Sequence, residues 1–237
     1  ECACVIAKAR ELRRCFAIDR LIALLEIGDG GTLGTGNYAG DISIASASGG
    51  TLSVNSSADQ ILDGIISGAG ALVKNNTGTL TLNGANTSNA SITINAGSLQ
   101  IGSAGLLGGG SYSGNIAINN SSAAFIFAGT NSQTISGAVS GNGAFTMNGT
   151  GTLTFSGAKS YTGGTTVNAG TLSINAGAIT GNITVNSGAR LTTANHNMFS
   201  GVGNLTVNGG TLDLSVFAQG SGPSVVNFTD ATVTGGG

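Results

Sequence analysis

Charged side chains, cysteine, proline and tryptophan are all scarce in this chain, and each scarcity narrows the class of protein. Of 237 residues only 8% are charged, one is proline and none is tryptophan. The three cysteines, Cys2, Cys4 and Cys15, lie at the N-terminus, so the rest of the chain lacks thiols for a disulfide framework or a cysteine zinc site. His196 is the single histidine. We therefore expect no metal site and no cofactor.

Basic residues are also few, and they are unevenly distributed. Five of the eight lie within the first twenty positions, and from Gly28 onward only Lys74, Lys159 and Arg190 remain. The formal net charge is −2. Three scattered cations cannot neutralise a phosphate backbone, so we expect no nucleic-acid partner.

Glycine is abundant, with 42 residues, and it introduces a short recurring string. The string is Gly-Thr/Ser-Leu-x-apolar, and its alternation of polar and apolar residues is typical of a strand with one buried face. Six copies occur, at residues 50–54, 78–82, 97–101, 151–155, 170–174 and 210–214.

The spacing of the copies indicates a solenoid. Gly78 to Gly97 and Gly151 to Gly170 are both 19 residues, and Gly170 to Gly210 is 40, or about two such steps. A longer repeat is also present, because residues 66–101 align without gaps on residues 139–174 with 18 identities and an offset of 73.

Two architectures combine short strands with Asn/Gly corners, namely a β-sandwich or barrel of hairpins and a parallel β-helix. Hairpins do not explain near-identical strings that recur at one fixed spacing, whereas a coil stacks such strings on successive turns. We therefore predict an all-β, parallel β-helix over residues 28–237, of about ten rungs and about 50 Å long. Asparagines at equivalent corners are expected to hydrogen-bond from rung to rung. The expected strands are residues 42–45, 51–54, 79–82, 91–94, 98–101, 115–118, 124–127, 144–147, 152–155, 165–167, 171–174, 183–185, 205–207 and 211–214.

Residues 1–27 differ from the rest, because they hold nine of the eighteen charges. Apolar residues interspersed with Lys and Arg predict a short amphipathic helix over Ile6–Ile27, acting as a solenoid cap. The alternative is sequence read from an incorrect start. Asp19 and Arg20 interrupt the one candidate apolar stretch, so neither a secretory signal nor a membrane span is expected here.

Two sets of recurring residues are expected to be structural. The leucines of the six strings are predicted to stack as one internal ladder: Leu52, Leu80, Leu99, Leu153, Leu172 and Leu212. Tyr38, Tyr112 and Tyr161 recur in one turn context, which favours a packing role over a catalytic one.

Part of the long repeat resembles a known family, and the resemblance is clearer in the C-terminal copy than in the N-terminal one. Residues 151–174 read Gly-Thr-Leu-Thr-Phe-Ser-Gly-Ala-Lys-Ser-Tyr-Thr-Gly-Gly-Thr-Thr-Val-Asn-Ala-Gly-Thr-Leu-Ser-Ile, and residues 78–101 are a degraded second copy. This string resembles the autotransporter-associated β-strand repeat, and related strings cover most of residues 28–237.

The resemblance implies a passenger region of a type V secreted protein of Gram-negative bacteria, with a right-handed parallel β-helix at the cell surface. The sequence has no recognisable signal peptide and no lipid-facing strands of a membrane barrel, so secretion by this route is inferred only from the passenger repeats. A barrel outside this fragment would supply the membrane anchor. The expected role is a stalk or adhesin with a glycan or protein receptor and no membrane insertion by this fragment. The repeat motif brings no catalytic or ligand-binding residues.

A polysaccharide-degrading enzyme is the catalytic alternative, and it would need clustered carboxylates on one face. Beyond Gly28 only Asp59 and Asp63 are close in sequence, and they are expected to form a solvated loop. His196, within Asn-His-Asn, is expected to be a polar loop residue, because no nucleophile elbow accompanies it. We predict no catalytic residues.

An ice-binding solenoid is the third alternative. Thr79 with Thr81, and Thr152 with Thr154, place two threonines on one side of a strand. The other copies carry Ser53, Gln100, Ser173 or Asp213 at the second position, which interrupts the row, and β-propensity alone explains such threonines.

Overall fold

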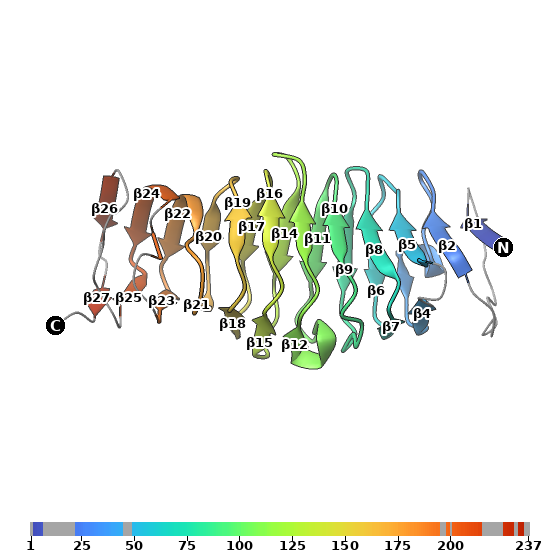
Figure 1. Ribbon diagram of the computed structural model, residues 1–237, viewed down its shortest axis with the longest axis horizontal. Helices are drawn as coiled ribbons and strands as arrows, with labels where there is room; N and C mark the ends of the chain where they lie inside the picture. Colours follow the sequence, from blue (N-terminus) through green and yellow to red (C-terminus); the bar gives the residue numbers. More distant parts are fainter. Residues whose placement is uncertain are drawn as a thin grey trace.

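The computed structural model is an elongated rod of short strands, with the two chain termini at opposite ends (Figure 1). The structure describes residues 2–6, 22–44, 49–194, 198–199, 201–214, 225–229 and 232–234. Within these residues the strands form three long sheets and one sheet of two strands.

Each long sheet runs along the rod and forms one of its faces. Sheet I contains eight strands: β1 (Cys2–Ile6), β2 (Ile22–Ile27), β5 (Thr51–Val54), β8 (Ala71–Lys74), β10 (Ile92–Ile94), β13 (Ile116–Ile118), β16 (Val139–Gly141) and β19 (Lys159–Tyr161). Sheet II contains ten: β3 (Asn37–Tyr38), β6 (Gln60–Leu62), β9 (Thr79–Leu82), β11 (Ser98–Ile101), β14 (Ala124–Phe127), β17 (Ala144–Met147), β20 (Thr165–Val167), β22 (Thr180–Asn186), β24 (Gly201–Asn208) and β26 (Val225–Thr229). Sheet III contains seven: β12 (Ser111–Tyr112), β15 (Gln133–Ile135), β18 (Thr152–Phe155), β21 (Gly170–Ile174), β23 (Ala189–Thr193), β25 (Thr211–Leu214) and β27 (Thr232–Thr234).

The fourth sheet and two short turns complete the described elements. Strands β4 (Ile42–Ile44) and β7 (Ile66–Gly68) pair with each other. They come directly before strands of sheet I in the chain, as β12, β15 and β18 do. Two 3-10 turns, η1 (Gly34–Gly36) and η2 (Gly108–Gly110), protrude from the rod.

Among the described residues, all strand-to-strand pairings are parallel, and each strand pairs with the strand one rung away. The predicted parallel β-solenoid is therefore confirmed, and the hairpin sandwich is excluded. The rungs differ in length, because the partner of Thr165 in the next rung is Ile183, whereas the partner of Ser98 is as far along the chain as Ala124. The strands keep their register while the corners absorb the difference.

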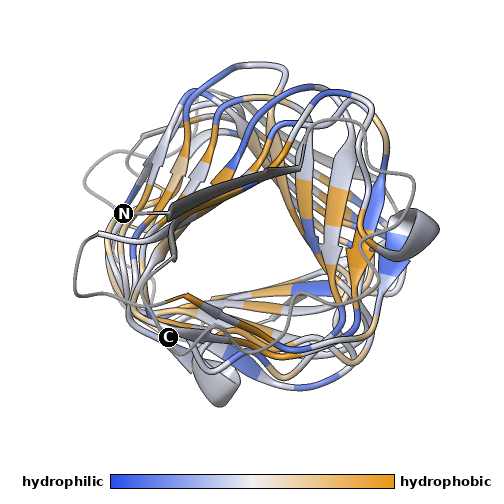
Figure 2. Ribbon diagram, turned by 90° about the vertical axis from the view of Figure 1, so that its right-hand side faces the viewer, coloured by the Kyte–Doolittle hydropathy of each residue, from blue (hydrophilic) through white to orange (hydrophobic). Residues whose placement is uncertain are grey.

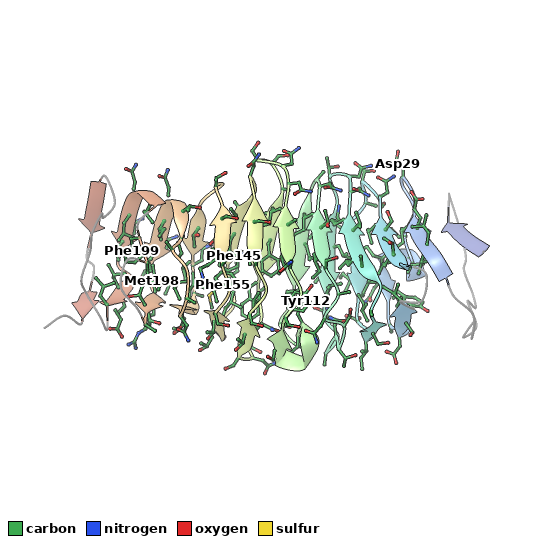
Figure 3. The ribbon with its side chains drawn as sticks, in the orientation of Figure 1. Asp29, Tyr112, Phe145, Phe155, Met198 and Phe199 are labelled. Carbon is green, nitrogen blue, oxygen red and sulfur yellow. The ribbon has the colours of Figure 1, made fainter. Side chains whose placement is uncertain are left out.

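The interior is apolar because inward and outward residues alternate along each strand. In β9, Leu80 and Leu82 are buried, whereas Thr79 and Thr81 are half-exposed. Viewed down the rod, the strands form a roughly triangular outline that carries bands of apolar residues (Figure 2). Phe145 contacts Phe125 and Phe155 inside the rod, with ring centroids 5.7 and 5.1 Å away (Figure 3).

The prediction of one leucine ladder is wrong, although all six leucines are buried. Leu52 belongs to sheet I, Leu80 and Leu99 to sheet II, and the remaining three to sheet III. Leu80 pairs with Leu99, and Leu153 pairs with Leu172. Leu172 reaches Leu212 through a leucine outside the six strings, Leu191. The copies therefore belong to three ladders.

The long repeat found in the sequence explains this distribution. Strand β8 of sheet I corresponds to β17 of sheet II, and β9 of sheet II corresponds to β18 of sheet III. The offset between the two copies is not a whole number of rungs, so the second copy lies one face further round the axis. The same residue string therefore forms different faces of one rod.

The helix predicted over Ile6–Ile27 is wrong at its C-terminal end. Ile22–Ile27 is the strand β2, which pairs in parallel with β5 through Leu25 and Leu52. Residues 2–6 form β1, which pairs with β2, and residues 7–21 lie outside the described residues. The run Ile-Ala-Leu-Leu-Glu-Ile is short enough for a strand, and sheet pairing outweighed its helical spacing.

Candidate functional site

The two carboxylates expected in a loop, Asp59 and Asp63, flank strand β6 and are exposed. Each makes a hydrogen bond to the next rung. The N–H of Thr79 donates to Asp59 Oδ1 at 2.7 Å, and Asn83 Nδ2 donates to Asp63 Oδ1 at 2.7 Å. These bonds give the pair a role in joining neighbouring rungs.

Other acidic side chains of the described region have similar partners. Asp29 accepts from Ser57 and Asn76, and Asp41 accepts from the N–H of Ile65 at 2.8 Å. Asp213 forms an ion pair with Arg190 on the outside of sheet III. The described residues contain no group of three or more His, Cys, Asp or Glu side chains placed to hold a metal ion. His196, Cys15 and Asp230 lie outside the described residues, and the side chains of Cys2 and Cys4 are not described.

The recurring tyrosines pack into the interior, as their repeated context predicts. Tyr112 and Tyr161 are buried, and Tyr38 is partly buried against the core. The hydroxyl of Tyr112 donates to the carbonyl of Ala90, and that of Tyr161 lies 2.7 Å from Thr165 Oγ1. Burial raises the pKa of both phenols above the ordinary value, because the interior disfavours a phenolate.

Two of the three basic residues beyond Gly28 are buried in the core, which the sequence did not predict. In sheet I, Lys74 stacks between Val54 of one neighbouring rung and Ile94 of the other, at a position that faces the interior. Its Nζ donates to the carbonyls of Asn75 and Asn76 at 2.6 and 2.7 Å. Burial lowers the pKa of Lys74 to about 8, and the nearby Asp59 opposes this shift.

Lys159 is the second buried lysine. Its Nζ donates to the carbonyl of Gly157 at 2.6 Å and to that of Ala176 one rung away, and it lies 5.9 Å from the centre of the Phe155 ring. Burial lowers the pKa of Lys159 to about 8. Both ammonium groups therefore donate hydrogen bonds to part-buried carbonyls at the corners of the rungs.

Buried amides do the same at other corners. Gln60 and Gln133 each accept a bond from the N–H of a leucine in the preceding rung, Leu33 and Leu107, at 2.6 and 2.8 Å. Each also donates back to the carbonyl of that leucine. These paired bonds hold the leucines that precede η1 and η2, so the protruding turns are fixed to the next rung.

Outside the core, asparagine side chains form the ladders that the repeated corners predict. In one ladder, at the ends of sheet I strands, Asn119 donates to Asn95 and Asn95 donates to Asn75, at 2.9 and 2.8 Å. A second ladder lies at the ends of sheet II strands and joins Asn148, Asn168, Asn186 and Asn208 at 2.7, 2.7 and 3.2 Å. The prediction of rung-to-rung asparagine bonds is confirmed.

Threonines stack beside the second ladder in a column that comparison of the six strings had missed. Thr146 pairs with Thr166, Thr166 with Thr184, and Thr184 with Thr206. Each lies two residues before an asparagine of the ladder. The signal was available in the sequence, where Thr-apolar-Asn recurs at residues 146–148, 166–168, 184–186 and 206–208.

The described rungs leave a small gap in the interior. A cavity of about 20 Å³ lies among Ile44, Ile66, Leu72 and Tyr112, which is the size of about one water. Among the described residues, no helix is long and apolar enough to cross a bilayer.

The comparisons with known proteins agree with this architecture. The passenger-associated-transport-repeat family model matches residues 72–101 and 145–174, which lie in the two copies of the long repeat. No curated protein and no solved structure matches the chain.

Stacked parallel rungs around a closed apolar interior define a β-solenoid. Two segments of this β-solenoid, residues 72–101 and 145–174, carry the passenger-associated-transport repeat, which is consistent with the passenger region of an autotransporter. The repeat family indicates a secreted or surface-exposed protein.

Proposed function

We propose that this chain is a rigid stalk of an autotransporter-type surface protein and that its outer faces contribute adhesion. The match of the passenger repeat to residues 72–101 and 145–174 carries this proposal. The continuous hydrogen-bonded sheets support it, because ten stacked strands in sheet II make a stiff spacer about 40 Å long at about 4.8 Å per step.

The positions of the titratable groups favour a structural role over polysaccharide cleavage. General acid and base catalysis needs carboxyl groups that face one substrate. Asp59 and Asp63 instead bond to Thr79 and Asn83 of the next rung. The buried ammonium group of Lys74 faces main-chain carbonyls, as does that of the other buried lysine.

The test is surface display. The chain is expressed in a Gram-negative host between a secretory signal and an outer-membrane translocator, with an epitope inserted after Gly188, a corner glycine whose surroundings are open. We expect protease added to intact cells to remove the epitope and the displayed cells to adhere to a glycan-coated surface. An epitope that stays protected until the cells are lysed would contradict the proposal.

A further inference from the structure

The C-terminal half of sheet II carries an outer array that differs from the other faces in its regularity. It consists of four threonines and four asparagines in two parallel columns, which we call the Thr/Asn array: Thr146, Thr166, Thr184, Thr206, Asn148, Asn168, Asn186 and Asn208. The threonines are half-exposed, three of the asparagines are exposed, and Asn186 is half-buried. Toward the N-terminus the threonine column continues through Ile126, Gln100, Thr81 and Ile61, so the unbroken pattern begins with β17.

Strand geometry fixes the spacing of the array. Rungs lie about 4.8 Å apart, and residues two apart on a strand lie about 6.7 Å apart, so the side chains form a flat lattice of neutral polar groups. Asn168, Asn186 and Asn208 each donate one N–H in the ladder, and Asn148 accepts the last of these bonds through its Oδ1. An amide has two N–H groups and two oxygen lone pairs, so every rung keeps bonding capacity beside its threonine hydroxyl.

The lattice is also fixed before any ligand arrives. Threonine is stiff at χ1 because it is β-branched, and each asparagine is held by its neighbour in the ladder. Ligand binding to such groups loses little side-chain entropy, so individually weak hydrogen bonds contribute more of their free energy to affinity.

From this arrangement we infer that the Thr/Asn array binds a neutral, unbranched polysaccharide lying along the solenoid axis. All eight side chains are uncharged, which fits a neutral ligand. They donate and accept hydrogen bonds, which fits hydroxyl groups. They repeat along the axis, which fits a polymer with one sugar per similar step. The inference rests on the proposed adhesive function and names its ligand class.

Other partners fit the described surface less well. A nucleic acid or sulfated polysaccharide needs basic side chains, and Arg190, which is on sheet III, is paired with Asp213. A protein partner usually needs large apolar anchors, and Ile65, 38% exposed, is the large apolar side chain exposed in the described region, distant in sequence from the array.

The experiment measures retention of the purified chain on insoluble neutral glucans and chitin, with a sulfated polysaccharide as comparison. The test variant is Thr166→Val with Thr184→Val, which removes two hydroxyl groups and keeps the shape and the β-branch. We expect retention by neutral polysaccharide to weaken by at least about tenfold, since two hydrogen bonds are lost from the array. Affinity for soluble fragments should rise with length until they span the four rungs, or about 15 Å at about 4.8 Å per step.

The matched control is Thr93→Val with Thr154→Val, on the outer sides of sheets I and III. It should bind as the parent does, and all variants should have the same melting temperature. Equal loss in the control, tighter binding to the sulfated polymer, or no retention on any neutral polysaccharide would overturn the inference. Thermal hysteresis that the test variant loses would assign the array to ice instead. Surface display is measured separately, so failure of sugar binding and failure of the stalk proposal can be told apart.

Discussion

At the residue scale, the lysines in the core are the least expected feature of the chain. Lys74 and Lys159 occupy inward positions at which neighbouring rungs carry Val54, Ile94 and Val139. Their ammonium groups have carbonyl partners but are removed from water, which disfavours the charge.

These lysines predict a stability that depends on pH. Their pKa in the folded state is about 8, below the ordinary 10.5, so the folded chain releases these protons first. The destabilisation is fully present below about pH 8 and is relieved as the pH rises toward 10.5, by on the order of 2 kcal/mol per lysine. Denaturant unfolding at about pH 7 and about pH 10 should show the increase.

The control is Lys74→Met with Lys159→Met, which should remove most of the increase; an unchanged increase would contradict the assignment.

The buried phenols act in the opposite direction at higher pH. The pKa values of Tyr112 and Tyr161 are raised in the folded state, so the unfolded chain ionises first. Stability should therefore fall above about pH 10, as these residues ionise on unfolding.

The inward leucines give a second prediction at this scale. Leu153 is fully buried and pairs with Gln133 and Leu172, whereas its neighbour Thr154 faces outward. Leu153→Asp should destabilise the chain by about 4 kcal/mol or more, because a buried charge has no partner there. Thr154→Asp should change stability by about 0.5 kcal/mol. Melting followed by circular dichroism compares the two, and similar losses would refute the inward placement of Leu153.

At the scale of the element, the corners decide which substitutions the rungs tolerate. Gly170 and Gly188 both have a left-handed backbone, with φ of +65° and +79°. A Cβ on Gly170 would lie 2.4 Å from the carbonyl oxygen of Gly151 in the preceding rung, whereas one on Gly188 would meet nothing within 4 Å. A substitution at Gly188 therefore tests backbone strain alone, whereas a substitution at Gly170 also tests the close packing of neighbouring rungs.

We predict that Gly188→Ala lowers the free energy of unfolding by about 1 kcal/mol through strain alone. Gly170→Ala adds a steric clash with a neighbouring backbone and should cost at least about 2 kcal/mol more. Denaturant titration of the two variants gives the comparison. Equal effects would show that the rungs separate easily at this corner.

At the scale of the whole molecule, each rung contacts mainly its two neighbours, so stability is expected to be local along the rod. In the Leu153→Asp variant, amide hydrogen exchange should therefore increase in β15, β18 and β21, which adjoin residue 153 in sheet III. Exchange in β5 and β8, several rungs away, should change little. Uniform loss of protection from end to end would indicate a single cooperative unit instead.

The sequence by itself determined the local structure of the rod. Alternation of Leu80 and Leu82 with Thr79 and Thr81 sets which side of a strand is buried, and the regular spacing of equal strings sets parallel stacking. The alternating pattern did not predict strands β6, β8, β15 and β19. In each of them a polar residue occupies an inward position where the pattern requires an apolar one, namely Gln60, Lys74, Gln133 and Lys159.

Only the tertiary structure decided which face each string occupies. Corners lengthen the rung between Ser98 and Ala124 and shorten the one between Thr165 and Ile183. The lengths of the corners before β17 accumulate along the chain, so the second copy of the long repeat advances by one face. The same accumulation aligns the four threonines of the Thr/Asn array, which no single string places together. Local residue preference fixes the strand, whereas the phase of the coil depends on the length of every preceding corner.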